Sequence, residues 1–334
     1  MRLRIPWQLG ALAAVCLCTA GLSTPASAGG AGAESSPPET VGLGAEPGGL
    51  LIQGITPGEV CDLAERAGIW LTIHNRGRIA HTYVLSSHRP SEIGNRRVPT
   101  GYRDIPDPSW FWFEQNEVRV DGQSSAQVRM YIGVPDDERH LNQHWSVSVG
   151  ITGKPEPGQT LALAVYPRYE IETASAPREG LRLRPAGTIG VSPSVVTVEG
   201  GRRPDTLVGE FYLCNNDRSR HGYLLTVLPA GVLPDGRQLS PSGGWSWVAD
   251  GMSVHVCRPT RRGPASAFST RRWPTFWLGP HRYVAVPVEV RLHPGRIVPG
   301  GGAEAIVLAE RDDGETAFVR VRVPRLQSEV GGAP

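Results

Sequence analysis

Two stretches of this sequence share one pattern: NRGRIAHTYVL at residues 75–85 and NNDRSRHGYLL at residues 215–225. Five residues recur with a constant shift of 140 positions and no gap. They are Asn75, Arg78, His81, Tyr83 and Leu85 in the first stretch and Asn215, Arg218, His221, Tyr223 and Leu225 in the second. Such a recurrence indicates that the chain contains two copies of one folding unit.

Each copy of the pattern is typical of a β-hairpin. Asn favours the turn that ends a strand, and the His, Tyr and Leu that follow stand at every second position, on one face of the next strand. A tyrosine ring can be buried while its hydroxyl finds a partner, and a leucine fills the core. We interpret the pattern as a hairpin with core anchors, because every repeat must build its own core whereas an active site is seldom needed twice.

The alternation of apolar and polar residues continues along the chain. Ile69, Leu71 and Ile73 are apolar at every second position, and residues 284–292 show the same period in the second half. The chain has 41 glycines and 30 prolines between such segments, and a helical pattern is limited to one turn at 62–67. The sequence therefore predicts an all-β protein of two tandem immunoglobulin-like sandwiches.

Two weaker matches extend the repeat. ITPGEV at 55–60 matches VSPSVV at 191–196 as the first strand of each copy, and FWFEQNEVRV at 111–120 matches FWLGPHRYVAV at 276–286. We therefore expect one sandwich at residues 50–172, a linker at 173–188, the other sandwich at 189–325 and a tail at 326–334.

The N-terminal residues predict export. Residues 1–28 have the parts of a secretory signal: a basic start, an apolar run at 9–22 and Ala-Ser-Ala before Gly29. A lipoprotein acylated at Cys16 or Cys18 is the alternative. Residues 29–49 have almost nothing to bury and predict a disordered leader. No later segment has the ~18 to 20 apolar residues of a membrane helix, so we expect a protein of the periplasm, the cell surface or the medium.

Three cysteines lie outside the predicted signal. Cys214 and Cys257 both belong to the second half, and we predict a disulfide between them if their strands are neighbours. Cys61 is then a free thiol or an intermolecular link. A Cys-x-x-Cys pair is absent from the sequence, so neither a redox motif nor a zinc ribbon is indicated.

The sequence has no motif that predicts catalysis. It lacks the nucleophile elbow, the H-E-x-x-H zinc motif, the P-loop and the dinucleotide-binding glycine motif. The segment PDDERHLNQHW at 135–145 has five ligand-type residues, but we interpret it as a solvated acidic loop. A net charge of +2 does not indicate nucleic-acid binding. We expect a protein without enzymatic activity, cofactor or metal.

Two kinds of side chain are the best candidates for binding. Paired tryptophans occur in WFWF and WSWV, where they can stack on sugars, form a protein interface or cover the junction of the two domains. An arginine-rich loop at 258–273 suits an acidic protein or an anionic polymer. The candidate binding residues are Trp110, Trp112, Trp245, Trp247, Arg258, Arg261, Arg262, Arg271, Arg272 and Trp273.

Several segments resemble a known class of proteins. The I-x-P…V strand at 55–60, the strand that ends at Asn75, and IPDPSW with VRVDGQSSAQVRMYIGVPDD between 105 and 137 resemble immunoglobulin-like bacterial envelope domains. Such domains occur in periplasmic pilus chaperones and in the peptidoglycan-binding half of proteins that interact with WxL surface proteins. The resemblance implies a sandwich that binds other envelope components and performs no chemistry.

These observations favour an exported binding or assembly module that recognises an envelope protein or an anionic or polysaccharide surface component. One alternative is a chaperone-like protein that acts by β-strand augmentation, which a free edge strand in the first domain would support. The other is a carbohydrate-binding or hydrolase accessory component, which paired acidic side chains beside the tryptophans would support.

Overall fold

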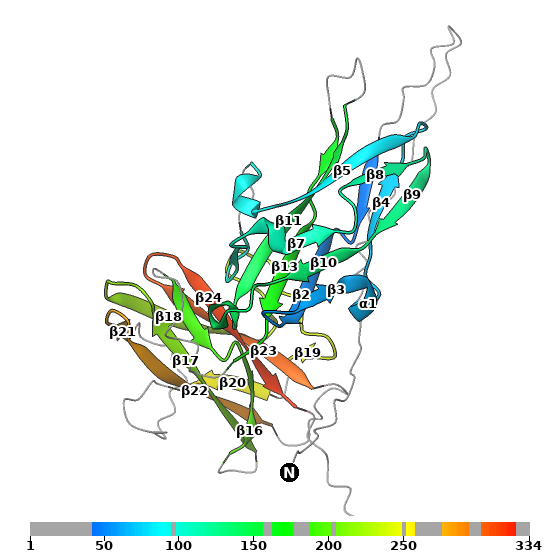
Figure 1. Cartoon of the computed structure of the whole chain (residues 1–334). Helices are drawn as coiled ribbons and strands as arrows, with labels where there is room; N and C mark the ends of the chain where they lie inside the picture. The colour runs from blue at the N-terminus through cyan, green and yellow to red at the C-terminus, as the bar shows by residue number, and fades with distance from the viewer. Residues whose placement is uncertain are drawn as a thin grey trace, which may run out of the picture.

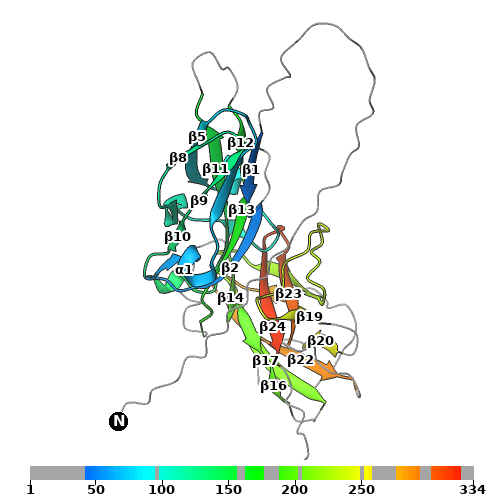
Figure 2. The same cartoon turned by 90° about the vertical axis from the view of Figure 1, so that its right-hand side faces the viewer.

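The computed structural model describes residues 42–94, 98–155, 162–176, 188–201, 205–248, 252–257, 276–293 and 302–324. The chain is almost entirely β-structure and forms two immunoglobulin-like sandwiches, as the sequence predicts. Figure 1 and Figure 2 show the first sandwich, in blue to green, end to end with the second, in green to red. The predicted signal peptide lies outside the described residues.

The first sandwich packs one large sheet against two small ones. The large sheet has the order β2-β13-β11-β5-β8, and the small sheets are β1-β4-β9 and β3-β10-β7. The large sheet contains β2 (Gly49–Ile55), β13 (Arg168–Thr173), β11 (His144–Gly153), β5 (His81–His88), β8 (Glu117–Val120), β6 (Arg103–Asp104) and β12 (Ala164–Val165). The small sheets contain β1 (Leu43–Glu46), β4 (Leu71–Asn75), β9 (Ser124–Val128), β3 (Val60–Asp62), β10 (Met130–Gly133) and β7 (Phe111–Phe113).

Four short helices connect these strands. In α1 (Leu63–Ala67), the carboxylate of Asp62 accepts from the amide of Ala64 at 2.8 Å, and the helix ends at Gly68 in the left-handed conformation. This confirms the helical turn expected at 62–67. The other three are the single turns η1 (Pro90–Glu92), η2 (Pro108–Trp110) and η3 (Glu138–His140).

The second sandwich packs the sheet β14-β17-β22-β20 against the sheet β15-β24-β23-β18-β21. The first contains β14 (Ile189–Ser192), β17 (Thr206–Asn215), β22 (Tyr283–Leu292) and β20 (Met252–Val256), with β16 (Glu199–Gly200) beside β17. The second contains β15 (Val195–Thr197), β24 (Thr316–Val323), β23 (Ala303–Arg311), β18 (His221–Leu228) and β21 (Phe276–Leu278), with β19 (Ser246–Trp247) beside β23.

Apolar residues at every second strand position supply both cores. In β4, Leu71 and Ile73 are fully buried, whereas the residues between them are half-buried. The corresponding strand β17 buries Phe211 and Leu213 in the same way. Burial of such side chains contributes about 1.5–3 kcal/mol each, which is why the alternation fixes the sheet face that turns inward.

The repeated pattern forms the same turn in both sandwiches, and in each the turn connects two strands of different sheets: β4 with β5 and β17 with β18. Asn75 donates its amide to the carbonyls of Ile79, Val120 and Asp121 at 2.7–3.2 Å, and its carbonyl accepts from the amide of Gly77 at 3.0 Å. Asn215 makes the matching four bonds, to Ser219, Leu278, Gly279 and Asp217. The asparagine thus closes the turn and connects it to the end of a neighbouring strand, which is β8 beside β5 in the first sandwich and β21 beside β18 in the second.

The anchor residues of the pattern are buried as expected. Tyr83 and Leu85 are each 3% exposed, and Tyr223 and Leu225 are 0% and 5% exposed. The core anchors are therefore confirmed, but the predicted hairpin is wrong: β4 pairs with β1 and β9 and β5 with β11 and β8, so the chain crosses from one sheet to the other at the turn.

The two weaker sequence matches are wrong. Leu43 of β1 pairs with Asn75 as Ile189 of β14 pairs with Asn215, so the strand at 189–192 corresponds to 43–46 and not to 55–60. Similarly, Phe276 of β21 pairs with Tyr223 in the position that β8, not β7, occupies in the first sandwich. Sequence similarity gave the wrong correspondence here, because two strands are equivalent only if they pair with equivalent partners.

The leader predicted at 29–49 is too long. Residues 43–46 form β1, whose four residues all pair with β4. The polar composition of this segment concealed a strand that needs only Leu43 and Ala45 to pack against the core. Residues 29–41 of the predicted leader lie outside the described residues.

Candidate functional site

The arginine-rich loop lies outside the part of the chain that the structure describes. This applies to Arg258, Arg261, Arg262, Arg271, Arg272 and Trp273. Its role in binding an acidic protein or an anionic polymer therefore stays a prediction.

The tryptophans at 110 and 112 do not form the expected ladder. Trp110 ends η2, where its ring lies 4.9 Å from the ring of His140 and 5.4 Å from that of Trp145. Trp112 lies in β7 and stacks on Tyr131 of the neighbouring strand β10, with 5.7 Å between ring centroids and 15° between planes. The ladder fails because the strand begins only at residue 111, so Trp110 has helical geometry.

The tryptophans at 245 and 247 lie over the sheet β15-β24-β23 of the second sandwich. Arg322 of β24 lies 5.1 Å from the ring centroid of Trp245. Trp247 packs against an apolar cluster that combines Tyr102 of the first sandwich with Phe318 of the second. Trp247 thus covers the junction of the two domains, one of the roles that the sequence left open.

The predicted disulfide is not formed. Cys61, Cys214 and Cys257 are all free thiols. β17, which contains Cys214, and β20, which precedes Cys257, lie on opposite sides of β22. Cys214 faces Tyr283, and the amide of Cys257 bonds to the carbonyl of Pro287, four residues farther along. The two sulfurs are therefore two strand spacings apart across the sheet and four residues apart along the strands, which is too far for a disulfide bond.

The acidic segment at 135–145 does not gather its side chains around one point. Asp137 caps η3 and forms an ion pair with Arg139, and this hydrogen bonding lowers the pKa of its carboxyl to about 2. His144 is buried at the domain junction and stacks on Phe318 with 3.9 Å between centroids. Among the described residues there is no group of three His, Cys, Asp or Glu side chains that could hold a metal ion.

A buried ion cluster joins the two sandwiches. Arg320 of β24 is fully buried and lies 2.6 Å from Glu172 of β13 and 2.6 Å from Glu304 of β23. Glu172 also accepts from the hydroxyl of Tyr102 at 2.7 Å and from the amide of Gln53 at 2.7 Å. Every partner is satisfied, which is the condition under which buried charges are tolerated.

The electrostatics of this cluster favour the ionised forms. Burial alone would raise the pKa of the Glu172 carboxyl, but the adjacent Arg320 guanidinium lowers it to about 2. Because Glu172 belongs to the first sandwich and Arg320 to the second, any separation of the domains would leave charges unpaired. The cluster therefore fixes the relative position of the two sandwiches.

The loop at 98–103 adds further contacts across the junction. Thr100 donates to Asp235 at 2.9 Å, the amide of Gly101 to Thr316 at 2.8 Å, and the guanidinium of Arg103 to Glu315 at 2.8 Å. Gly101 has a φ of 81°, and a Cβ there would lie 2.4 Å from Phe318. Only glycine allows this loop to approach the second sandwich so closely.

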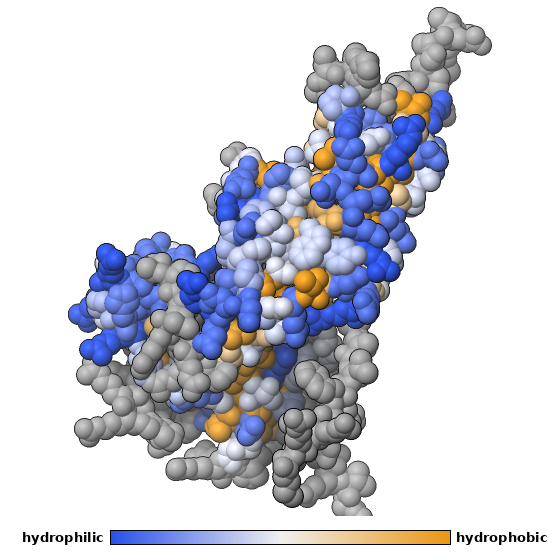
Figure 3. All heavy atoms as spheres, in the orientation of Figure 1, coloured by the Kyte–Doolittle hydropathy of each residue, from blue (hydrophilic) through white to orange (hydrophobic). Residues whose placement is uncertain are grey.

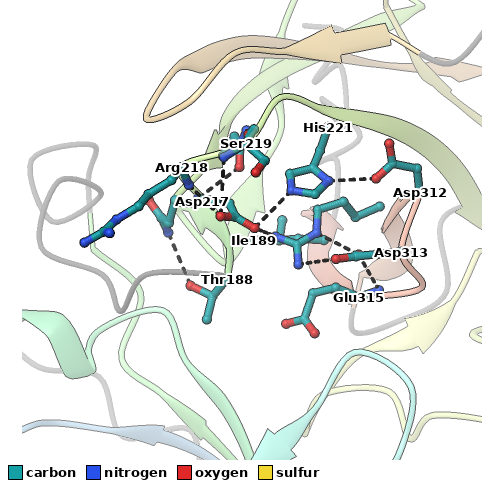
Figure 4. A network of polar contacts seen from close by, with 12 residues as sticks. Thr188, Ile189, Asp217, Arg218, Ser219, His221, Asp312, Asp313 and Glu315 are labelled. Carbon is teal, nitrogen blue, oxygen red and sulfur yellow. Dashed lines mark hydrogen bonds and ion pairs between the residues drawn. The ribbon is translucent and has the colours of Figure 1, made fainter.

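A second charged cluster lies at the end of the second sandwich. Figure 4 shows His221 between two carboxylates, with Nδ1 2.8 Å from Asp312 and Nε2 3.0 Å from Asp217. Arg311 pairs with Asp313 at 2.6 Å. Since both ring nitrogens of His221 face carboxylates, the hydrogen bonds favour the charged imidazolium and raise the pKa of His221.

In the first sandwich β1 and β12 lie side by side, as Figure 2 shows, and we call the line between them the seam. Within the described residues, β1 pairs only with β4 and β12 only with β11. Farther along, β13 is paired on both sides, by β11 and β2. The seam has apolar walls, with Leu43 and Val165 half-buried against the core and Leu163 41% exposed.

The backbone at this seam is available for pairing. The carbonyls of Leu163 and Pro167 accept from the amides of Gly153 and Val149 of β11, each at 2.9 Å. Facing and non-facing residues alternate in an antiparallel pair, so the amide and carbonyl of Ala164 point away from β11. An added strand would find its first hydrogen-bonding partner at Ala164.

The outer face of β3-β10-β7 is rich in aromatic side chains. We call Val60, Trp70, Trp112, Arg129 and Tyr131 the aromatic face. Figure 3 shows pale side chains of intermediate hydropathy in the middle of the upper sandwich, where Figure 1 places β7 and β10. Trp112 and Tyr131 are half-exposed, and Val60 is 66% exposed.

Sequence reasoning missed the ion cluster and the seam. Arg320 stands at an outward position in TAFVRVRV, where a solvated charge is the usual outcome, and alternation cannot show that another domain covers that face. At the seam, Leu161, Leu163 and Val165 alternate in GQTLALAV, a period-two signal that was present but is too short to identify an edge.

No family model and no curated protein matches the chain. Among solved structures, the chain is similar to a PapD-like domain of human CEP192, at 13% identity over 46% of this chain and 99% of that chain, with a TM-score of 0.30. It is also similar to the E. coli chaperone DraB, at 11% identity over 85% and 98%, with a TM-score of 0.27. A third similar structure is the Salmonella enterica SafA pilin in complex with the SafB chaperone, at 10% identity over 85% and 97%, with a TM-score of 0.27. The function of this chain must come from its own geometry.

Proposed function

We propose that the protein is an exported, non-enzymatic binding or assembly module that takes a protein partner by β-strand augmentation at the seam between β1 and β12. The observation that carries the proposal is the free edge of β12, where the backbone of Ala164 points outward beside the exposed Leu163. No helix of the described residues is long and apolar enough to cross a membrane.

An added strand would gain both polar and apolar contacts at the seam. Each backbone hydrogen bond contributes about 0.5–1.5 kcal/mol net, and alternate side chains of the partner would pack on Leu163. Because β1 lies directly beside β12, the added strand would take the place of β1 along β12. Main-chain bonds supply affinity and the apolar walls supply selectivity. This mode needs no catalytic side chain.

The ion cluster at the junction supports the same function. Arg320 and Glu172 hold the second sandwich in a fixed position, so a partner seated on the first sandwich meets a preformed surface. A preformed surface reduces the ordering cost of association. The binding energy then need not be used to align the domains.

The experiment compares two substitutions at one position. Ala164→Pro removes the outward amide without removing a bond to β11, because proline is tolerated on an edge strand. Ala164→Val keeps the amide and is the matched control. The native protein and both variants are used to capture partners from envelope extract, and hydrogen exchange is followed in residues 162–166 of each complex.

We expect the native protein and Ala164→Val to retain one partner with slowed exchange at 162–166, and Ala164→Pro to lose it. Leu163→Asp should weaken capture, whereas Val208→Asp, at a similarly exposed strand position of the second sandwich, should not. Capture that survives Ala164→Pro would exclude strand addition. If capture is lost only when Arg261, Arg262, Arg271 and Arg272 are replaced by Ser, the arginine-rich loop is the binding surface.

A further inference from the structure

We propose that the aromatic face of the first sandwich is a second binding site, which takes a neutral sugar polymer through stacking and hydroxyl hydrogen bonds. This site is separate from the seam, because it lies on the outer face of β3-β10-β7 whereas the seam lies between edges of the other two sheets.

The indole of Trp112 lies against the sheet. A Cβ on Gly133, on the neighbouring strand β10, would lie 2.8 Å from Cη2 of Trp112. The ring therefore extends across β10 and rests where Gly133 has no side chain. The outer edge of the indole is supported at Gly133, the ring stacks on Tyr131, and Trp112 remains partly exposed. A sandwich core does not require such a ring, because the inward positions of β7 are filled by Phe111 and Phe113.

Polar groups adjoin the stacked rings. Arg129 precedes β10, and its guanidinium donates to Asp62 at 3.0 Å and lies 5.2 Å from the ring centroid of Trp70. Its side chain is 42% exposed, so donor groups remain accessible to a ligand. Asp62 is opposite Tyr131 in the pairing of β3 with β10. An aromatic pair beside an ion pair offers an apolar surface together with hydrogen-bond donors and acceptors.

The charge of the face favours a neutral ligand rich in hydroxyl groups. Arg129 and Asp62 cancel each other, so the face presents no net field to attract a polyanion. A pyranose ring matches this arrangement, because its C–H groups can pack on an aromatic ring while its hydroxyls both donate and accept. A protein partner would instead have to cover the exposed ion pair, which costs desolvation.

The test uses the full mature chain and three soluble neutral polysaccharides: a β-glucan, a mannan and dextran. Retardation in native gels that contain each polymer measures binding, and tryptophan fluorescence gives the affinity for whichever polymer binds. The variants are Trp112→Ala, Gly133→Val and Arg129→Gln. Trp277→Ala is the control, since Trp277 is 54% exposed on the second sandwich.

We expect at least one polymer to retard the native protein, and Trp112→Ala to weaken the affinity about tenfold or more, as truncation of a central aromatic anchor does. Gly133→Val keeps every exposed residue but displaces the indole, so it should weaken binding without loss of a ligand contact. Trp277→Ala should bind normally. Thermal unfolding of each variant verifies that it is folded.

Three results would overturn the proposal. They are no retardation by any of the polymers, retardation that Trp112→Ala leaves unchanged, and loss of a captured protein partner in Trp112→Ala. The last result would make the face a protein interface. Ala164→Pro should leave retardation unchanged, so failure at this site and failure at the seam are distinguishable.

Discussion

The two copies of the repeated turn share the same hydrogen bonds and core residues but differ in the charges around them. Asn75 and Asn215 make the same four hydrogen bonds, yet His81 and His221 have different surroundings. In the second copy Asp217 replaces Gly77, while Arg311 and Asp312 stand where the first copy has Gly153 and Lys154. The residues that fix the fold are shared, whereas the neighbours that add charge belong to one copy.

His81 and His221 make different contacts because of these neighbours. A Cβ on Gly153 would lie 2.6 Å from Nε2 of His81, so this imidazole fills space that a larger residue would need. In the second copy Arg311 stands at that position, and His221 lies instead between two carboxylates. Asp217 and Asp312, which the first copy replaces by Gly77 and Lys154, are therefore what makes His221 part of an ion cluster.

The same contrast holds for the last strand of each sandwich, where we expect the largest effect. Arg320 and Arg168 occupy equivalent positions, since each pairs with the strand that begins its large sheet. Arg320→Met should lower the free energy of unfolding by about 3–5 kcal/mol, because two buried glutamates lose their partner. Arg168→Met should cost less than about 1 kcal/mol, because Arg168 is partly exposed.

Denaturant unfolding of the full chain measures both variants. The paired substitution Arg320→Met with Glu172→Gln should recover part of the loss, because one unpaired charge is removed. Equal losses for Arg320→Met and Arg168→Met would show that the junction does not depend on the buried ion cluster.

The second-largest loss of stability should be equal in the two copies. Asn75→Ala and Asn215→Ala each leave buried carbonyls without a donor, and each should cost about 2 kcal/mol, since an unsatisfied buried group costs about 1–3 kcal/mol. The measurement is again denaturant unfolding. Hydrogen exchange of the amides in each turn reports its local opening. A difference above about 1 kcal/mol between the copies would mean that the charged neighbours, and not the asparagine, hold the second turn.

The fold was largely predictable because it depends on local signals. Alternation and the repeated asparagine indicated two sandwiches, since both act within one strand or one turn. The hairpin and the equivalence of other strands were predicted wrongly because both depend on pairing partners far away in sequence, such as Phe276 with Tyr223. The ion cluster around Arg320 could not be predicted because its residues come from three strands in two sandwiches.

The candidate sites were predictable only in part. Trp112 was identified from its aromatic neighbours, but Gly133 and Tyr131, which position it, carry no signal without the pairing of β7 with β10. The disulfide was predicted because Cys214 and Cys257 both belong to the second half of the chain, and position in the sequence does not show which strand lies beside each residue. Three-dimensional adjacency is the information that a single sequence lacks in each case.

The smallest effect is a pH dependence confined to the second copy. Hydrogen bonds to Asp312 and then to Asp217 raise the pKa of His221, although burial and Arg311 oppose the shift. Asp313 and Glu315 lie on the same turn as Arg311, which holds Asp313. A histidine whose pKa is raised in the folded state stabilises fully below its unfolded pKa of about 6.5, and that stabilisation is lost as the pH rises through the folded pKa.

We therefore expect the native protein to lose stability between pH 6 and pH 8 at the turn between β17 and β18. His221→Gln should be less stable than the native protein at pH 6 and differ less at pH 8. Denaturation midpoints at the two pH values give the comparison, and the NMR titration of the imidazole gives the pKa directly. If His221 titrates at or below the unfolded value, its two carboxylates do not stabilise the charged form, and the divergence between the two copies has no electrostatic consequence.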